Sequence, residues 1–219
     1  MSIISSGQWW RYHEEGYLHL GKLLGDAELK GLQQRINDIM LGKIPFEGYM
    51  QLDRGGAYTN LDSGGKFAGP SLEYRKIQDL EHDPLFLAYM QMLIFREIGD
   101  YHYGAHAGIA CYRAMFMNKP ARKGTVLPWH QDGGGIWGLD RDPLATTWTA
   151  LDPATIANGC VQIIPGSHKL GLLSKHGHTI SKEQEHDYCA PCKIVHLELK
   201  PGEVVLLHNF LLQDRKSVV

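Results

Sequence analysis

Near the middle of the chain, one short stretch reads Pro128-Trp129-His130-Gln131-Asp132-Gly133-Gly134-Gly135. His130 and Asp132 are two residues apart, so in an extended segment their side chains point to the same face. An imidazole and a carboxylate are two of the three protein ligands that hold non-heme Fe(II) in a facial triad. The three glycines that follow let the backbone open beside the pair. The stretch therefore predicts a metal site that still needs a third ligand.

The composition is typical of one globular domain. The chain has 219 residues, of which 43% are hydrophobic, and a formal net charge of −2. We see no long basic run, and so expect neither a nucleic-acid nor a membrane partner. The apolar runs are far shorter than the roughly 20 residues that a membrane span needs. Residues 1–6 lack a basic and then apolar signal, which predicts a cytoplasmic protein.

The cysteines do not indicate a disulfide scaffold, because four are too few for a chain of this length. Cys189 and Cys192 have a spacing that resembles redox or zinc motifs, but zinc would need a second pair of ligands. We expect these two to be free thiols in a loop.

Residues 1–107 are predicted to form helices and loops. A short helix over 8–16 ends at Gly16, and a strand follows over 17–20. Asp26 is predicted to cap the next helix. The apolar residues of that helix recur at spacings of three and four: Leu29, Leu32, Ile36, Ile39 and Met40.

Two further segments complete this half of the chain. Residues 42–71 are rich in glycine and predict long loops with one short strand. Such loops often form substrate walls, and we expect substrate to enter over the glycine-rich segments 48–70 and 133–138. Asp83-Pro84 is a good helix start and predicts a helix over 85–98.

Residues 108–219 show a strand pattern instead of a helical one, with turn residues between short apolar runs. The predicted strands are 109–117, 148–151, 161–164, 194–199 and 204–212, with a tight turn at 200–203. Helices followed by many short strands indicate a β-sandwich or barrel with helices outside it. We find no repeat and no linker, and so predict a single domain over 1–219.

Two later motifs give the His130/Asp132 pair a context. Asn158–Lys169 reads as a turn, a strand and a second turn, and Leu199–His208 reads as a turn followed by a strand. Taken in order with Trp129–Asp132, these motifs resemble the phytanoyl-CoA dioxygenase family of Fe(II)/2-oxoglutarate oxygenases. Trp10–Leu20 and Arg75–Leu85 resemble that family as well, so the resemblance covers nearly the whole chain.

The resemblance implies a fold that is mainly β with flanking helices: a cupin-like jelly roll, the double-stranded β-helix. It implies that His130 and Asp132 bind Fe(II), and that 2-oxoglutarate is the co-substrate. With O2, such an enzyme hydroxylates a small organic or acyl substrate and releases succinate and CO2. Trp148 matches a family position near the co-substrate, and Tyr112, on the strand before the metal motif, is a second candidate for the cofactor site. No catalytic residue is expected beyond the metal ligands.

The C-terminal segment departs from the family pattern. The third metal ligand of the family is a histidine, and Gln213 holds the aligned position. An amide oxygen is a much poorer donor for Fe(II) than an imidazole. His208 is the alternative third ligand, but it would face the other way in a continuous strand. The family's 2-oxoglutarate arginine is not found in the six residues after Gln213, and the last core strand is expected to be missing.

These departures leave two alternatives open. One is a catalytically impaired or inactive member of the family that acts as a binding protein. The other is a cupin-like enzyme that uses a metal but not 2-oxoglutarate, although the His-Gln-Asp motif lacks the nearby second histidine that cupins usually present.

Overall fold

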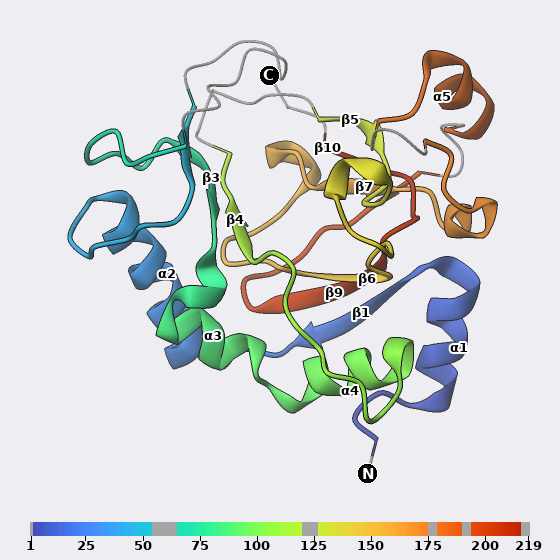
Figure 1. The fold of residues 1–219 in the computed structure, drawn as a ribbon, viewed down its shortest axis with the longest axis horizontal. Coiled ribbons are helices and arrows are strands. Elements are labelled where there is room, and N and C mark those ends of the chain that lie inside the picture. Colours follow the sequence, from blue (N-terminus) through green and yellow to red (C-terminus); the bar gives the residue numbers. More distant parts are fainter. Residues whose placement is uncertain (1, 54–64, 120–126, 175–178, 190–193, 216–219) are drawn as a thin grey trace. The chain divides into compact units, whose positions relative to one another are not determined.

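The structure is a computed structural model that describes residues 2–53, 65–119, 127–174, 179–189 and 194–215 (Figure 1). The chain divides into two compact units. One consists of residues 1–24 and 126–218, and the other of residues 25–125. No helix in the described part of the chain combines the length and hydropathy needed to cross a membrane.

The first unit contains two antiparallel sheets. The three-stranded sheet has the order β1-β9-β6 (Figure 1). The four-stranded sheet has the order β5-β10-β7-β8. Their bounds are β1 Tyr17–Lys22, β5 Leu127–His130, β6 Ala145–Thr149, β7 Val161–Ile163, β8 Val195–His196, β9 Glu203–His208 and β10 Gln213–Arg215.

One apolar cluster joins these two sheets. It contains Val205 and Leu207 from β9 and Val161 and Ile163 from β7, so each sheet contributes its inward-facing residues. Val205 and Ile163 are both fully buried. Side chains that alternate along a strand and pack against a facing sheet are typical of a sandwich core.

The predicted continuous strand over 204–212 is wrong. β9 ends at His208, whose backbone N–H donates to Gly16, and a turn closes when the N–H of Leu211 donates to the carbonyl of His208. The chain then enters the other sheet as β10, which lies between β5 and β7. β10 is the last strand in the described residues, and a missing final core strand stays a prediction.

Two helices of this unit are stabilised at their N-termini by capping boxes. α1 (Ser6–Glu15) begins after Ser5, and α5 (Lys182–Tyr188) begins after Ser181. α1 ends, as predicted, at Gly16, which has the left-handed φ of 79° that favours glycine.

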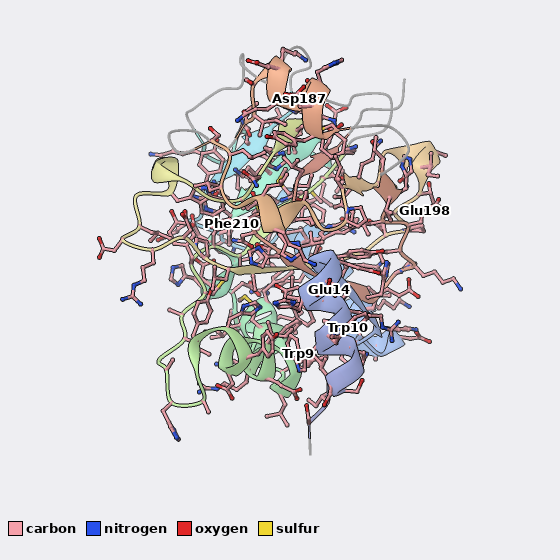
Figure 2. All side chains as sticks on the ribbon, turned by 90° about the vertical axis from the view of Figure 1, so that its right-hand side faces the viewer. Trp9, Trp10, Glu14, Asp187, Glu198 and Phe210 are labelled. Atoms are coloured by element: carbon pink, nitrogen blue, oxygen red, sulfur yellow. The ribbon has the colours of Figure 1, made fainter. Side chains whose placement is uncertain are left out.

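α1 packs on η5, a short 3-10 helix over Ser167–Leu170. The Lys169 ammonium lies 2.6 Å from the carboxylate of Glu14, the α1 residue labelled in Figure 2. The N–H of Gly166 donates to the carbonyl of Glu15. Two more 3-10 turns, η3 (Gly135–Trp137) and η4 (Ile156–Asn158), lie in the loops of this unit.

The second unit combines helices with a small antiparallel sheet of order β2-β3-β4. Its elements are α2 Asp26–Met40, β2 Met50–Leu52, β3 Tyr74–Gln78, η2 Leu80–His82, α3 Pro84–Met90, α4 Leu93–Tyr103 and β4 Met115–Met117. β2 is the short strand predicted within the glycine-rich segment 42–71, of which residues 54–64 lie outside the described part.

Several predicted boundaries in both units are wrong. Gly25, not Asp26, is the N-cap of α2, and Asp26 lies in its first turn. The single helix predicted over 85–98 is two helices, because α3 ends at Met90 and α4 begins at Leu93. Only 115–117 of the strand predicted over 109–117 pairs with a neighbour. The strand predicted at 148–151 begins earlier, since residues 145–149 all pair with β9.

Candidate metal centre

β5 places His130 on the core face of the four-stranded sheet. His130 pairs directly with Gln213 of β10, and Gln213 pairs on its other side with Ile163 of β7. Directly opposed residues in antiparallel strands have side chains on the same face, so all three point toward the cluster between the sheets. Trp129, one residue earlier, points to the opposite face and is buried with Ile164, Ile180 and Leu212.

A hydrogen bond fixes the tautomer of His130. Its Nδ1 lies 2.8 Å from the carbonyl oxygen of Pro128, which can only accept, so Nδ1 carries the proton. Nε2 is then the nitrogen with the lone pair, and it is the atom that faces Asp132, 3.9 Å from Oδ1. Metal-binding histidines are commonly oriented in this way by a hydrogen bond from their other ring nitrogen. His130 is only 6% exposed, and its role as a metal ligand stays a prediction with which this orientation is consistent.

Asp132 lies just beyond the end of β5, where the backbone leaves the sheet. Its N–H donates to the carbonyl of Asn209 at 2.7 Å, which ties the loop after β5 to the turn between β9 and β10. The side chain of Asn209 accepts in turn from the hydroxyl of Thr146 on β6 at 2.8 Å. The position of Asp132 therefore depends on elements from both sheets.

Gln213 completes this arrangement. It is 8% exposed, and its Nε2 donates to Oδ2 of Asp132 at 2.6 Å. The structure thus brings together His130, Asp132 and Gln213, the three positions that the sequence pattern aligned with the ligands.

Gln131, between the two candidate ligands, is fully buried and fully hydrogen-bonded. Its Nε2 donates to the carbonyls of Gly171 and Phe210, at 2.9 and 2.6 Å, and its Oε1 accepts from the N–H of Leu173 at 2.7 Å. One side chain therefore holds the loop over 171–173 and the β9–β10 turn against the metal motif. Alternation along the strand indicates that Gln131 faces away from the ligands, but nothing local in the sequence signals these distant partners.

The backbone after Asp132 is closely covered by apolar side chains. A Cβ atom added to Gly133 would lie 2.9 Å from the ring of Phe210 and 3.0 Å from Leu172. Gly134, the next residue, donates its N–H to the carboxylate of Asp142 at 2.6 Å. Glycine at 133 thus lets Phe210, labelled in Figure 2, approach the backbone beside the candidate metal ligands.

His208 lies in a different environment from the pair. Its ring centroid is 5.0 Å from that of His168 and 6.4 Å from that of Tyr12, and its Nδ1 accepts from the N–H of Phe210 at 3.1 Å. The ring thus packs among residues of α1 and η5. Its role as an alternative third ligand stays a prediction without support from these contacts.

The remaining predicted residues are distributed over both units. Trp148 on β6 pairs with Val205 and packs against the core cluster of the first unit. Tyr112 belongs to the second unit and is 40% exposed, with the Arg113 guanidinium 5.2 Å from its ring centroid. Both cofactor-site assignments stay predictions.

Cys189 is a free cysteine at the end of α5. Burial, with the nearby charges of Glu185 and Asp214, raises the pKa of its thiol to about 11, so it is not a reactive thiolate. Cys192 lies outside the described residues.

The donor set fits two of the three positions of an iron site. His130 supplies an imidazole nitrogen and Asp132 a carboxylate oxygen, the ligand types of the facial triad. Among the residues that the structure describes, no three His, Cys, Asp or Glu side chains gather into a metal-binding group. Gln213 occupies the third position with an amide.

The fold defines a structural class that includes proteins solved with 2-oxoglutarate and with Fe. EctD from S. alaskensis, solved with 2-oxoglutarate and 5-hydroxyectoine, matches with a TM-score of 0.78 at 19% identity, over 100% of this chain and 72% of that one. EctD with bound Fe matches with a TM-score of 0.74 at 20% identity, over 99% and 72% of the two chains. The predicted jelly-roll fold is confirmed, and 2-oxoglutarate and Fe are the groups that these neighbours hold.

Relatives identify the family within this class. The model of the family Phytanoyl-CoA dioxygenase (PhyH) matches residues 12–212. A probable phytanoyl-CoA dioxygenase of Caenorhabditis elegans is 28% identical, over 96% of this chain and 70% of that protein. The peroxisomal phytanoyl-CoA dioxygenase of Homo sapiens is 25% identical, over 92% of this chain and 60% of that protein. The chain belongs to the phytanoyl-CoA dioxygenase family, and its cytoplasmic location stays a prediction.

Proposed function

We propose that this chain hydroxylates a small organic or acyl substrate in an Fe(II)- and 2-oxoglutarate-dependent reaction, with His130 and Asp132 as metal ligands. The observation that carries the proposal is the orientation of His130, whose Nδ1 is bound to Pro128 and whose Nε2 faces Asp132. Fe(II) bound there would supply the redox chemistry by which substrate, 2-oxoglutarate and O2 become hydroxylated product, succinate and CO2.

The protein's own residues would hold the ion and shape its surroundings. The His130 ring is fixed by its hydrogen bond to the Pro128 carbonyl, and the Asp132 backbone by its N–H bond to Asn209, so little conformational freedom would be lost when an ion binds. The apolar side chains of Phe210 and Leu172 beside Gly133 favour an aliphatic part of a substrate near the ligands. Trp148 stays our candidate for a contact with 2-oxoglutarate.

Succinate formation tests this proposal. The purified chain, supplied with Fe(II), 2-oxoglutarate and O2, should form succinate even without its substrate, and H130A and D132A should each lower that rate at least tenfold. Gln34→Leu, at an exposed residue of α2 outside the candidate site, serves as the control and should keep the basal rate. Equal rates in the wild-type chain and in H130A would overturn the assignment of the ligands.

A second candidate function is a family member that binds 2-oxoglutarate or another ligand without turnover. The hydrogen bond from Gln213 to Asp132 favours it, because an amide stands where the family has its third histidine. The same assay separates the two functions. If the wild-type chain forms no succinate and Gln213→His does, the chain is a binding protein with an impaired metal site.

A further inference from the structure

The two carboxylate oxygens of Asp132 have different partners. Oδ1 faces Nε2 of His130 at 3.9 Å, and Oδ2 accepts a hydrogen bond from Nε2 of Gln213 at 2.6 Å. A carboxylate can only accept, so the Gln213 amide must present its NH2 group to Oδ2 and turn its oxygen away from it. The amide thereby fixes which oxygen of Asp132 is turned toward the imidazole.

Gln213 is held in place by its backbone rather than by the contact with Asp132. It is paired in register with His130 on one side and Ile163 on the other. The residue before it, Leu212, donates its N–H to the hydroxyl of Ser167 at 2.8 Å and accepts from the N–H of Ile164 at 3.0 Å. The backbone of Gln213 is therefore held on both sides, and this places the amide donor beside Asp132.

We infer that Gln213 is a positioning residue for Asp132 and not a metal ligand. The inference rests on the proposed function and refines its site. Gln213 holds Oδ2, so Asp132 would offer Oδ1 alone and an ion at this site would be held by two protein atoms. The coordination position that a third histidine would fill is open to water or another small donor from solution. A hydrogen-bonded partner of a metal ligand typically changes metal affinity 10–100-fold when it is removed.

Mn(II) is a suitable probe because its affinity and its number of bound waters can both be measured, by electron paramagnetic resonance and by water-proton relaxation. Gln213→Met keeps the length of the side chain and removes the donor. We expect it to weaken Mn(II) binding about 10-fold or more with no change in the number of waters. Gln213→His adds a ligand, and should tighten binding and remove one water.

Gln34→Leu is the matched control. Gln34 is an exposed residue of α2 whose Nε2 also donates to an aspartate, Oδ1 of Asp38, at 2.9 Å. Its removal should leave Mn(II) affinity unchanged. Thermal unfolding of each variant shows whether the fold is kept, and Gln213→His gives the water count even if Gln213→Met does not fold.

Each contrary outcome has a distinct meaning. A gain of one water in Gln213→Met would show that Gln213 is a ligand and would overturn the inference. Unchanged affinity in that variant would overturn it too, as would binding by Gln213→His when the wild-type chain binds no Mn(II). By contrast, equal binding by the wild-type chain and His130→Ala, or no binding by either the wild-type chain or Gln213→His, would overturn the proposed function itself.

Discussion

Gln131 donates a hydrogen bond of 2.6 Å to the carbonyl oxygen of Phe210, 79 positions further along the chain. The bond connects the metal motif on β5 to the turn between β9 and β10, and that turn leads directly to Gln213. One side chain that faces away from the candidate ligands therefore ties the β5 motif to the turn that precedes Gln213.

Replacing Gln131 by leucine should destabilise the protein strongly. The change leaves two carbonyls and one N–H without the partners they have in the buried wild-type arrangement, and each such group costs about 1–3 kcal/mol. We expect the free energy of unfolding, measured by urea denaturation, to fall by about 3 kcal/mol or more. Gln34→Leu on the exposed face of α2 should change it by less than about 0.5 kcal/mol. A loss as small as that of the control would mean that the three bonds contribute little.

Ser167→Ala tests the support of β10. The hydroxyl of Ser167, a buried residue, accepts from the N–H of Leu212, one residue before Gln213. Alanine removes the acceptor, and we expect a loss of about 1–3 kcal/mol in the free energy of unfolding. Amide hydrogen exchange at Leu212 should accelerate more than exchange at Leu206 in the middle of β9. Similar acceleration at both sites would indicate a general rather than a local effect.

Gly133→Ala tests the close approach of Phe210. The added methyl group would lie 2.9 Å from the Phe210 ring, so the ring must move, and overpacking of this kind costs about 1–3 kcal/mol. In a Phe210→Ala background, Gly133→Ala should lower the free energy of unfolding by about 0.5 kcal/mol or more less than in the wild-type chain, because the two sites share one contact. Gly108→Ala, which would meet nothing within 4 Å, is the control. Strict additivity of Gly133→Ala and Phe210→Ala would contradict the contact.

His102 on α4 should make stability depend on pH. Burial lowers the pKa of His102 to about 4, compared with about 6.5 in an unfolded chain. Between these values the unfolded chain binds a proton that the folded chain does not, so the stability present above pH 6.5 is lost as the pH falls toward 4.

His102→Gln should therefore lose less stability between pH 7.5 and pH 5 in urea denaturation than the wild-type chain. Burial also lowers the pKa of His168, which likewise reduces stability as the pH falls. The stability of His102→Gln should therefore still depend on pH to some extent. Replacement of the exposed His106 by glutamine is the control. An equal loss of stability between pH 7.5 and pH 5 in His102→Gln and in the wild-type chain would show that His102 is not the cause.

Local chemistry explains which parts of the fold were predictable. The left-handed Gly16 ends α1, and the spacing of Leu29, Leu32 and Ile36 matches the buried face of α2. Such features act within a few residues, and the sequence shows them directly. The apolar spacing continues through the break between α3 and α4, and the sequence therefore predicts one helix there.

The pairing of His130 with Asp132 was evident in the sequence for the same reason, since two residues at i and i+2 on an extended segment share a face. The order of short motifs further along the chain indicated the family. What the sequence could not show is the path of the chain after His208. A strand pattern over 204–212 is equally consistent with one long strand or with two strands in different sheets.

Only the tertiary structure decided where Gln213 lies relative to His130 and Asp132. The turn after β9 moves the chain into the other sheet, and β10 sets Gln213 directly opposite His130. The sequence by itself determined that a histidine and a carboxylate are present together and that a glutamine follows where a histidine was expected. Whether that glutamine reaches Asp132 depends on strand register, which long-range backbone pairing fixes and no local residue pattern encodes.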